Sequence, residues 1–354
     1  MERKNSRRVC VTGGSGYIGS FLVKKLLEKG FTVHATLRNL EDEKKVGILK
    51  SLPHAETNLV LFQADIYNPT QFEAAIKHCH SVFHVATPLL HIPSPTSQYK
   101  NTVEAAIGGV QGIAECCIRS QSVKRLIYTA SVVAASPLKE DGSGFKPSMD
   151  ESCWSPLSLP FNHSNDHLLG YVRSKTLAEQ EILSYNNEKE AGNELEVVSL
   201  VCGLVGGDTI LPYLPSSMET FVSQLTGNYS FYDTLKFLEG LLGAVPLVHI
   251  EDVCEAHIFC MEKPYLKGRF ICAVANPTIT DIAAQFQENF PDLEIAGEFM
   301  QERMEKGTIC DSTKLMKIGF EYQYDVKKII KDSVECGRRL GAINIPTNKV
   351  TSSE

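Results

Sequence analysis

The stretch Val9-Cys10-Val11-Thr12-Gly13-Gly14-Ser15-Gly16-Tyr17-Ile18-Gly19 decides the fold of this chain. It is predicted to form a short apolar strand, a glycine-rich turn and the start of an amphipathic helix over Tyr17–Lys29. Gly13 allows the tight turn, Gly16 lets backbone approach a pyrophosphate, and Gly19 lets the helix pack closely on the strand. The free N–H groups of the helix N-terminus attract the same anion. This order of elements predicts a dinucleotide-binding unit, against the alternative of an ordinary strand–turn–helix.

Composition excludes several classes of protein. The 354 residues are 43% hydrophobic and 22% charged, which is ordinary for a globular protein, and the net charge of -7 argues against binding to nucleic acid or anionic membranes. No apolar run precedes the first strand or approaches the roughly 20 residues of a membrane-spanning helix, so neither a signal peptide nor a membrane segment is expected. The eleven cysteines form no CxxC pair and no metal-ligand spacing. They predict reduced thiols, no metal site and a cytoplasmic location.

Apolar runs alternate with helical patterns through the first two-thirds of the chain. Helices are expected from Pro69, near Ser97–Ser120 and near His167–Ala191. This alternation predicts an α/β fold, a doubly wound parallel sheet that binds its ligand at the carboxyl ends of the strands. The six predicted strands are Arg8–Thr12, Phe31–Leu37, Leu59–Gln63, Ser81–Ala86, Val123–Thr129 and Leu195–Val201.

The pattern loosens after Val201. Residues 1–200 are therefore predicted to be mainly the dinucleotide-binding domain, residues 201–343 mainly a smaller substrate lobe, and residues 344–354 a disordered tail. Residues 248–275 are a candidate to return to the first domain. The later elements expected are a strand at Val248–Ile250, a helix from Glu251, a strand at Arg269–Cys272, a helix from Thr280 and a helix at about Val326–Leu340.

The end of the second strand bears on the choice of cofactor. A domain that binds NAD(H) places an Asp or Glu there to bind the ribose 2′-hydroxyl, whereas this strand ends in Thr36-Leu37-Arg38. A guanidinium can bind a 2′-phosphate bidentately, and Lys44 and Lys45 add positive charge. NADP(H) is therefore favoured. The acidic run Glu41–Glu43 keeps NAD(H) open, and the alternative for Arg38 is a plain surface residue.

A Tyr-x-x-x-Lys pair places a phenol and an ammonium on one helix face, where they can protonate a ketone that accepts hydride. We expect the ammonium to lower the pKa of the phenol. Tyr171 with Lys175 is favoured because it follows a long loop, near a helix start at the same end of the sheet as the glycine turn. Ser131 closes an apolar strand at that end and could hold the carbonyl oxygen. The alternative for Ser131 is an ordinary turn residue, and the alternative for Lys175 is a solvated charge on the helix surface. The rival pairs are Tyr185/Lys189, Tyr232/Lys236 and Tyr324/Lys328.

Other aromatic and histidine residues are predicted to be structural. Trp154, the only tryptophan, and His163 and His167 lie in the loop before Tyr171 and are expected to pack or face solvent. His249 and His257 flank a predicted helix start and are expected to make structural hydrogen bonds.

Together these stretches resemble the extended short-chain dehydrogenase/reductases, and more closely the plant dihydroflavonol reductase, anthocyanidin reductase and vestitone reductase group. The resemblance implies a Rossmann domain with a smaller carboxyl-terminal substrate lobe, and it covers nearly the whole chain. The matching stretches are Thr12–Gly19, Arg38 with Lys45, Val82–Pro88, Tyr128–Ser131, Tyr171–Glu179, Val248–Val253 and Ser312–Gly319.

The resemblance also implies roles for single residues. Tyr171 would donate the proton, Lys175 would hold the nicotinamide ribose, and Ser131 would polarise the carbonyl. Asp65 and Ile66 would lie near the adenine, and Ser217 would lie on the nicotinamide side. The full set expected along the cofactor is Thr12, Gly13, Gly16, Tyr17, Ile18, Gly19, Arg38, Lys45, Asp65, Ile66, Val85, Ala86, Thr87, Tyr171, Lys175, Cys202, Gly203, Val205 and Ser217.

Three positions depart from that group. Gly203 stands where a proline is usual, which predicts a more mobile loop over the nicotinamide. Gly108 stands where the wider superfamily often has a relay asparagine, so a proton relay would run through water. Ser136 stands where dihydroflavonol reductases carry an asparagine that contacts substrate hydroxyls, which favours another substrate.

The main hypothesis is an NADPH-dependent reductase of a flavonoid-like or other polycyclic ketone of plant specialised metabolism. One alternative is an NAD(P)⁺-dependent dehydrogenase that oxidises an alcohol or a cyclic hemiacetal. A catalytically idle, redox-sensing dinucleotide-binding protein and a sugar-nucleotide epimerase are two further alternatives. The partner is expected to be a small molecule, and the sequence leaves the oligomeric state open.

Overall fold

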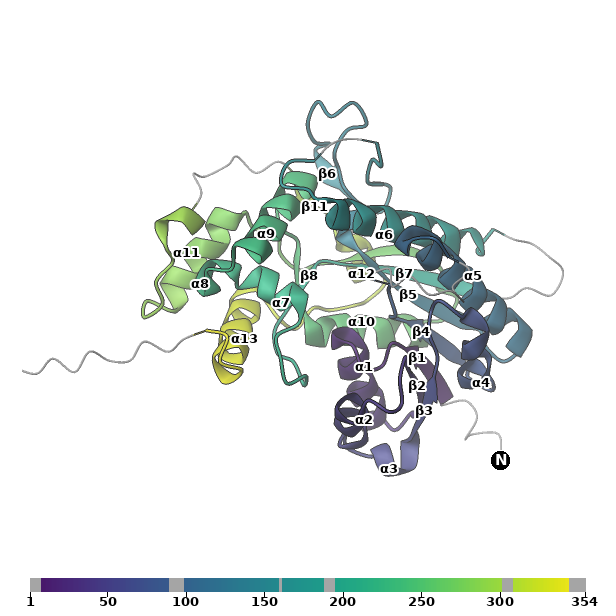
Figure 1. Cartoon of the computed structure of the whole chain (residues 1–354). Coiled ribbons are helices and arrows are strands. Elements are labelled where there is room, and N and C mark those ends of the chain that lie inside the picture. Colours follow the sequence, from purple (N-terminus) through teal and green to yellow (C-terminus); the bar gives the residue numbers. More distant parts are fainter. Residues whose placement is uncertain (1–7, 89–98, 159–160, 188–194, 301–307, 344–354) are drawn as a thin grey trace, which may run out of the picture.

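Seven parallel strands form the central sheet, in the order β10-β7-β5-β4-β1-β2-β3. The computed structural model describes residues 8–88, 99–158, 161–187, 195–300 and 308–343 (Figure 1). The order runs outward from β1 in one direction and from β4 in the other, which creates a switch point where such sheets bind ligands. The strands are β1 (Arg8–Thr12), β2 (Thr32–Leu37), β3 (Leu59–Gln63), β4 (Ser81–His84), β5 (Arg125–Ser131), β7 (Glu196–Cys202) and β10 (Gly268–Cys272).

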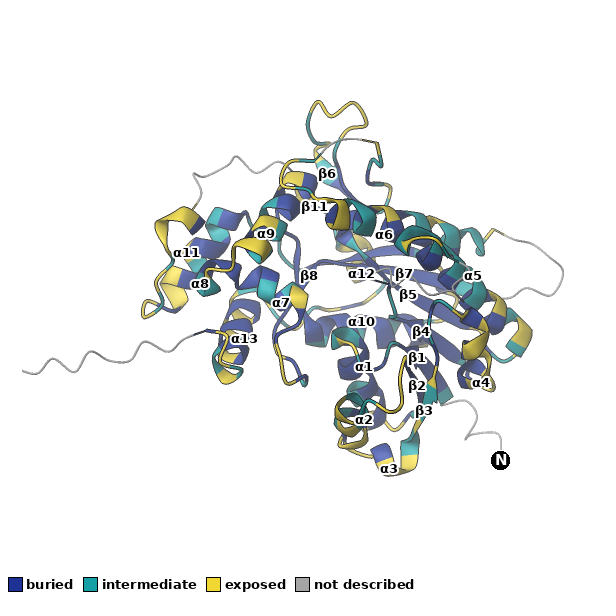
Figure 2. Ribbon diagram, in the orientation of Figure 1, coloured by how far each residue is buried: buried dark blue, intermediate teal, exposed yellow. Residues whose placement is uncertain are grey.

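Helices cover both faces of this sheet, and each face has its own apolar core. Figure 2 shows the strands buried between the two helical layers, which explains why they are apolar without alternation. One layer contains α1 (Tyr17–Glu28), α2 (Glu43–Lys50), α3 (Ala55–Asn58), α10 (Ile250–Glu262) and α12 (Thr313–Lys317). The other contains η2 (Pro69–Phe72), α4 (Glu73–Ile76), α5 (Thr102–Ser120), η3 (Val132–Ala134) and α6 (Asp166–Ser184).

The remaining elements gather beyond the carboxyl ends of β5 and β7, to the left of the sheet in Figure 1. Short parallel pairs join β8 to β9 and β11 to β6. The elements are β6 (Ser148–Met149), β8 (Leu204–Gly206), α7 (Ser216–Phe221), α8 (Ser223–Thr226), α9 (Tyr229–Leu242), β9 (Leu247–His249), α11 (Ile279–Asn289), η4 (Gly297–Phe299), β11 (Ile309–Cys310) and α13 (Val326–Arg339). No helix within the described ranges is long and apolar enough to cross a membrane.

The predicted fold class is confirmed, with small differences in element bounds. β4 stops at His84 instead of Ala86, because the N–H groups of Val85 and Ala86 donate to the Thr12 hydroxyl, at 3.2 Å each. β5 continues past Thr129 to Ser131, since β7 runs alongside as far as Cys202. α5 starts at Thr102 and α6 ends at Ser184, so both are shorter than predicted.

Other predictions differ more. Helices α2, α3, α7, α8, α9 and α12 were not predicted. β10 joins the central sheet beside β7, and the return of residues 248–275 to the first domain stays a prediction. The two-lobe division at residue 200 stays a prediction, and the tail 344–354 lies outside the described residues.

Candidate active site

The glycine turn joins β1 to α1 at the carboxyl edge of the sheet. Gly13 has φ of +68°, and a Cβ there would lie 3.0 Å from the Ala86 Cα. A Cβ on Gly19 would lie 2.1 Å from the Gly13 carbonyl oxygen, so α1 can pack on the turn only without a side chain. Gly16 differs, because it is exposed and a Cβ would meet only the Gly13 oxygen, at 3.4 Å. The open space at Gly16 fits the approach of a ligand.

The N-terminus of α1 has free N–H groups. Its N-cap residue, Gly16, supplies no side-chain cap, and its first turn contains no acid. The other described helices of eight or more residues each begin with a capping side chain. The exposed glycine and the uncapped N-terminus together form a cradle that fits the pyrophosphate of a dinucleotide.

Thr12 holds the segment after β4 against this turn. Its hydroxyl lies 2.8 Å from His84 Nδ1 and also accepts the two N–H groups that end β4. Burial lowers the pKa of His84 to about 3, with the charge of Lys175 acting in the same direction, so the imidazole stays uncharged. The predicted cofactor residues Val85, Ala86 and Thr87 are thereby fixed, half-buried, at the carboxyl edge.

At the adenine end, Arg38 follows β2 and is exposed. The acidic run beside it belongs to α2: Asp42 caps this helix by accepting the Lys45 N–H at 3.2 Å, and Glu43 lies in its first turn. The Lys45 ammonium pairs with the Asp42 carboxylate at 3.1 Å. No acid therefore stands at the end of β2, where binding of the ribose 2′-hydroxyl requires one.

The residues predicted near the adenine follow β3. The Asp65 carboxylate accepts the Tyr67 N–H at 3.1 Å and shapes the turn there. Ile66 is buried against α5, where a Cβ on Gly109 would lie 2.4 Å from it. Ile66 thus packs the segment after β3 against α5.

Ser131, Tyr171 and Lys175 meet at the carboxyl edge of the sheet. Ser131 is the last residue of β5, and Tyr171 lies in the second turn of α6, close enough for the Ser131 hydroxyl to lower the pKa of its phenol. Lys175 lies one turn further on and is buried. Its Nζ donates to the Thr129 carbonyl at 2.7 Å and to the Thr87 hydroxyl at 3.3 Å.

Burial controls the electrostatics of this cluster. It lowers the pKa of Lys175 to about 8, with the Glu179 carboxylate opposing the shift. It also raises the pKa of Tyr171, and the hydrogen bond with Ser131 offsets part of that rise. The expectation that Lys175 lowers the pKa of Tyr171 is therefore wrong for the protein alone. Its ammonium is directed at Thr129 and Thr87, so desolvation of the phenol dominates.

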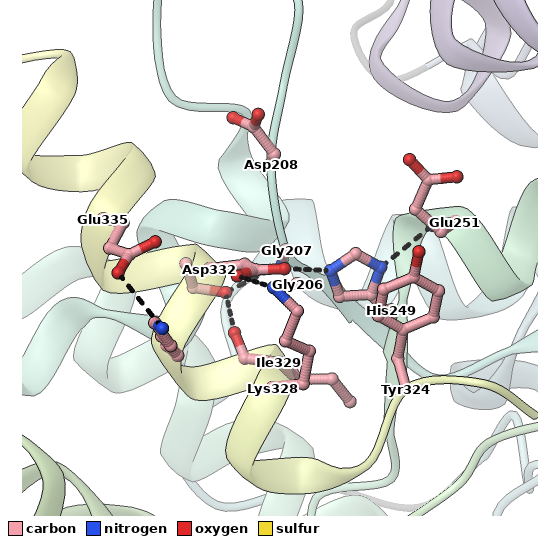
Figure 3. A network of polar contacts seen from close by, with 12 residues as sticks. Gly206, Gly207, Asp208, His249, Glu251, Tyr324, Lys328, Ile329, Asp332 and Glu335 are labelled. Atoms are coloured by element: carbon pink, nitrogen blue, oxygen red, sulfur yellow. Dashed lines mark hydrogen bonds and ion pairs between the residues drawn. The ribbon is translucent and has the colours of Figure 1, made fainter.

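Two of the rival Tyr-x-x-x-Lys pairs are used in packing. The Tyr324 ring stacks on His249, with centroids 4.1 Å apart, and Lys328 pairs with Asp332 at 2.6 Å (Figure 3). Tyr232 is buried and donates to the Phe299 carbonyl at 3.1 Å, while Lys236 pairs with Asp233. Lys189 of the third pair lies outside the described residues.

The residues predicted on the nicotinamide side come from the end of β7 and the segments that follow it. Cys202 pairs in register with Ser131 and is buried, as is Val205 in β8. Ser217 is half-buried on α7, which packs on β8. The Gly203 N–H donates to the Cys272 carbonyl at 3.0 Å, and a Cβ on Gly203 would lie 2.6 Å from the Pro246 oxygen. The structure thus gives a packing reason for this glycine.

The other two positions that depart from the related reductases, Gly108 and Ser136, also have neighbours that account for the residue found there. The Tyr99 ring occupies the space over Gly108, since a Cβ there would lie 2.4 Å from the ring. Ser136 is fully buried and donates to the Leu241 carbonyl at 2.5 Å. The Ser136 hydroxyl is therefore used in joining η3 to α9.

The histidines predicted to be structural do make such bonds. His249 caps α10 and lies 3.1 Å from Asp332, and His257 lies 2.8 Å from the Thr129 hydroxyl. Sequence reasoning missed the Thr129 carbonyl and Glu179 as neighbours of Lys175. The Lys175–Glu179 spacing of one helical turn was the available signal for the second.

Comparison with known proteins identifies the class. Residues 9–271 match the NAD dependent epimerase/dehydratase family, and the chain belongs to that family. It is 36% identical over 335 residues to a putative anthocyanidin reductase of Ginkgo biloba, covering 95% of each chain. It is 36% identical over 352 residues to a dihydroflavonol 4-reductase of Callistephus chinensis, covering 99% of this chain and 92% of that one.

Comparison with solved structures points to the same class of protein. The fold superposes on vestitone reductase from alfalfa with a TM-score of 0.76 at 30% identity, covering 95% of this chain and 99% of that one. The predicted family is confirmed, and the chain is an oxidoreductase that acts on carbonyl or hydroxyl groups.

Proposed function

We propose that this chain is an NADP(H)-dependent reductase of a carbonyl group on a flavonoid-like or other polycyclic plant metabolite. The observation that carries the proposal is the meeting of Ser131 and Tyr171 at the carboxyl edge of the sheet, with Lys175 buried one turn further along α6. The relatives are named for anthocyanidin, dihydroflavonol and vestitone, which supports a ring ketone of similar chemistry as the substrate.

NADPH supplies a hydride to the carbonyl carbon when it is bound. The uncapped N-terminus of α1 and the exposed Gly16 would hold its pyrophosphate. Arg38 would bind the 2′-phosphate, as a planar guanidinium suits a phosphate. Lys45 could add its charge by releasing Asp42, because their ion pair is partly exposed.

The chain's residues would act on the carbonyl oxygen. The hydroxyls of Ser131 and Tyr171 would both donate to this oxygen, which gains negative charge as the carbon is reduced. The Tyr171 proton would then move to the oxygen and leave a phenolate, which the Lys175 ammonium stabilises. The raised pKa of Tyr171 supports this direction, because the phenol keeps its proton at neutral pH until the substrate accepts it.

The opposite direction remains the second candidate. A phenolate at Tyr171 could accept the proton of an alcohol that is being oxidised. The run Glu41–Glu43 no longer supports NAD⁺ for that reaction, because Asp42 caps α2 and Glu43 lies in its first turn.

Purified protein with NADPH and a panel of flavonoid ketones tests the proposal. We expect oxidation of NADPH, and we expect Tyr171→Phe to lower kcat by about 10²- to 10⁴-fold with NADPH affinity retained. Tyr324→Phe is the matched control and should retain full turnover. Wild-type kcat in Tyr171→Phe, or no NADPH oxidation with any ketone, would contradict the proposal.

We also propose that a small molecule is the only partner the reaction requires and that the protein works in the cytoplasm. None of the eleven cysteines forms a disulfide, and ten of them are buried, which supports a reducing compartment.

A further inference from the structure

A buried ion pair lies beneath the proposed active site. Glu179 on α6 is fully buried one turn beyond Lys175, and Arg269 on β10 is 5% exposed. The guanidinium binds the carboxylate with two hydrogen bonds, of 2.8 and 2.9 Å. The Ser199 hydroxyl donates to the same carboxylate at 2.6 Å. Bidentate pairs of this kind fix orientation as well as charge.

The other hydrogens of Arg269 bind two further segments of the chain. They donate to the Ala134 carbonyl at 3.1 Å, to the Glu151 carbonyl at 3.2 Å and to the Cys153 carbonyl. All five guanidinium hydrogens thus have acceptors. The guanidinium also stacks on Trp154, with Cζ 3.8 Å from the ring centre.

These contacts concern the site because of where the acceptors lie. Ala134 ends the turn that follows Ser131, and Glu179 belongs to the helix of Tyr171. Residues 151–154 lead into the loop before that helix. One guanidinium therefore connects the backbone after the serine, the helix of the tyrosine and the loop between them.

The pair also sets the charge around Lys175. The titratable groups that face Lys175 are Glu179 on its own helix, Tyr128 on β5, Cys202 on β7 and His84 on β4. Burial raises the pKa of Tyr128 and lowers that of His84, so both are uncharged at neutral pH. The carboxylate of Glu179 is the charge that favours the ammonium of Lys175.

We propose that Glu179 and Arg269 are positioning residues that hold Ser131, Tyr171 and Lys175 in reactive geometry and, through Glu179, set the charge at Lys175. This inference rests on the proposed function. It separates two contributions: the guanidinium fork supplies geometry, and the carboxylate supplies charge.

A second buried pair offers a matched control. Arg125 on β5 is 5% exposed, binds Glu196 on β7 at 2.9 Å and donates to the Cys260 and Met261 carbonyls at 2.6 and 3.1 Å. This pair joins the first residue of each of these strands, at the amino edge of the sheet, away from Ser131. It matches the first pair in chemistry and in burial of the arginine.

The experiment compares four single variants in the full chain with NADPH and a ketone that wild type reduces. Arg269→Lys keeps the charge but loses the fork, so kcat should fall by about 10- to 100-fold while its pH profile stays in place. Glu179→Gln keeps the shape but loses the charge, so the alkaline fall of kcat should move to lower pH. Arg125→Lys and Glu196→Gln should lower the unfolding midpoint and leave both kinetic quantities unchanged.

The double variant Glu179→Gln/Arg269→Met covers the case in which single variants fail to fold, because it leaves no buried charge unpaired. It should fold, with kcat about 10- to 100-fold below wild type. If Glu179→Gln keeps the wild-type pH profile, or if Arg269→Lys or the double variant keeps wild-type kcat, the positioning role is overturned.

Two readouts do not depend on turnover. The titration of the Lys175 ammonium, measured by nitrogen NMR on lysine-labelled protein with Lys175→Arg to assign the signal, should move to lower pH in Glu179→Gln. The emission of Trp154, the only tryptophan, should shift to longer wavelength in Arg269→Lys as the loop loosens. If wild type reduces no ketone, the proposed function fails, whereas an unchanged titration and emission in these variants contradict the positioning role.

Discussion

Strand β5 has a polar residue at each of its two ends, and the two residues are used differently. It begins with Arg125 at the amino edge and ends with Ser131 at the carboxyl edge. Every nitrogen of the Arg125 guanidinium binds either the Glu196 carboxylate or a backbone carbonyl in the last turn of α10. The hydrogen-bonding capacity of the Arg125 guanidinium is therefore satisfied within the molecule.

At the carboxyl edge, polar groups keep unused capacity. Among the described residues, Lys175 directs its ammonium at two acceptors, Thr129 and Thr87, although it has three hydrogens. The N-terminus of α1 has no side-chain cap. The comparison teaches that buried charge at one edge serves stability, while the other edge leaves polar groups available to a ligand.

The largest effect is expected at the amino edge. Arg125→Met leaves Glu196 and the carbonyl acceptors without their donor, so the free energy of unfolding should fall by about 3–5 kcal/mol. Urea unfolding measures this, with the exposed neighbour change Lys124→Met as control, expected within about 0.5 kcal/mol of wild type. A loss of kcat in folded Arg125→Met protein would break the comparison.

Ser131→Ala tests the other end of the same strand. It removes a donor to the carbonyl oxygen, so kcat should fall by about 10²- to 10³-fold with little change in stability. Steady-state kinetics and urea unfolding on one preparation measure both. Ser122→Ala, just before the strand, should leave kcat unchanged, and equal losses in the two serine variants would argue against a role for Ser131.

Arg38→Ala tests the choice of cofactor. Loss of charged hydrogen bonds to the 2′-phosphate should weaken NADPH binding by about 10- to 100-fold and leave NADH binding unchanged. Titration calorimetry with both cofactors measures the ratio. Lys50→Ala, at the far end of α2, is the control. An unchanged ratio of the two affinities in Arg38→Ala would remove the argument for NADP(H).

The pH dependence of reduction is the smallest effect. The lowered pKa of Lys175, about 8, means that the ammonium is present below pH 8 and is lost as pH rises through that value. Reduction needs the ammonium, so kcat should fall about threefold between pH 7.5 and 8.5. Lys175→Arg, which stays charged, should abolish the change over that range in whatever activity it retains. A rate that rises across the same range would contradict the assignment.

Much of the fold could be predicted because the central strands are buried on both faces and are continuously apolar, as in Leu126–Ala130. Helix α9 was missed although Asn228 caps it and Gly243 ends it with φ of +75°. Its buried residues Tyr232, Leu235 and Leu242 recur at helical spacing, so the signals for α9 were present in the sequence and were missed.

The site could be predicted only where a residue's role follows from its position within a single helix or strand. Tyr171 and Lys175 are one helical turn apart, and Ser131 closes a strand, so their residue types and positions suggested the cluster. Arg269 and Glu179 are 90 residues apart with no spacing rule to join them. The direction of the pKa shift of Tyr171 was wrong because burial, which dominates it, cannot be read from a motif.

The contacts of Arg125 also bear on how the chain is made. Its acceptor Cys260 is 135 residues downstream, and β10, beside β7, follows later still. During synthesis on the ribosome, more than a third of the polypeptide is therefore made after Arg125 before the carbonyl acceptors of its guanidinium exist. A fragment ending at residue 200 would lack these acceptors, so we expect the nascent first half to stay unfolded until the later segments emerge.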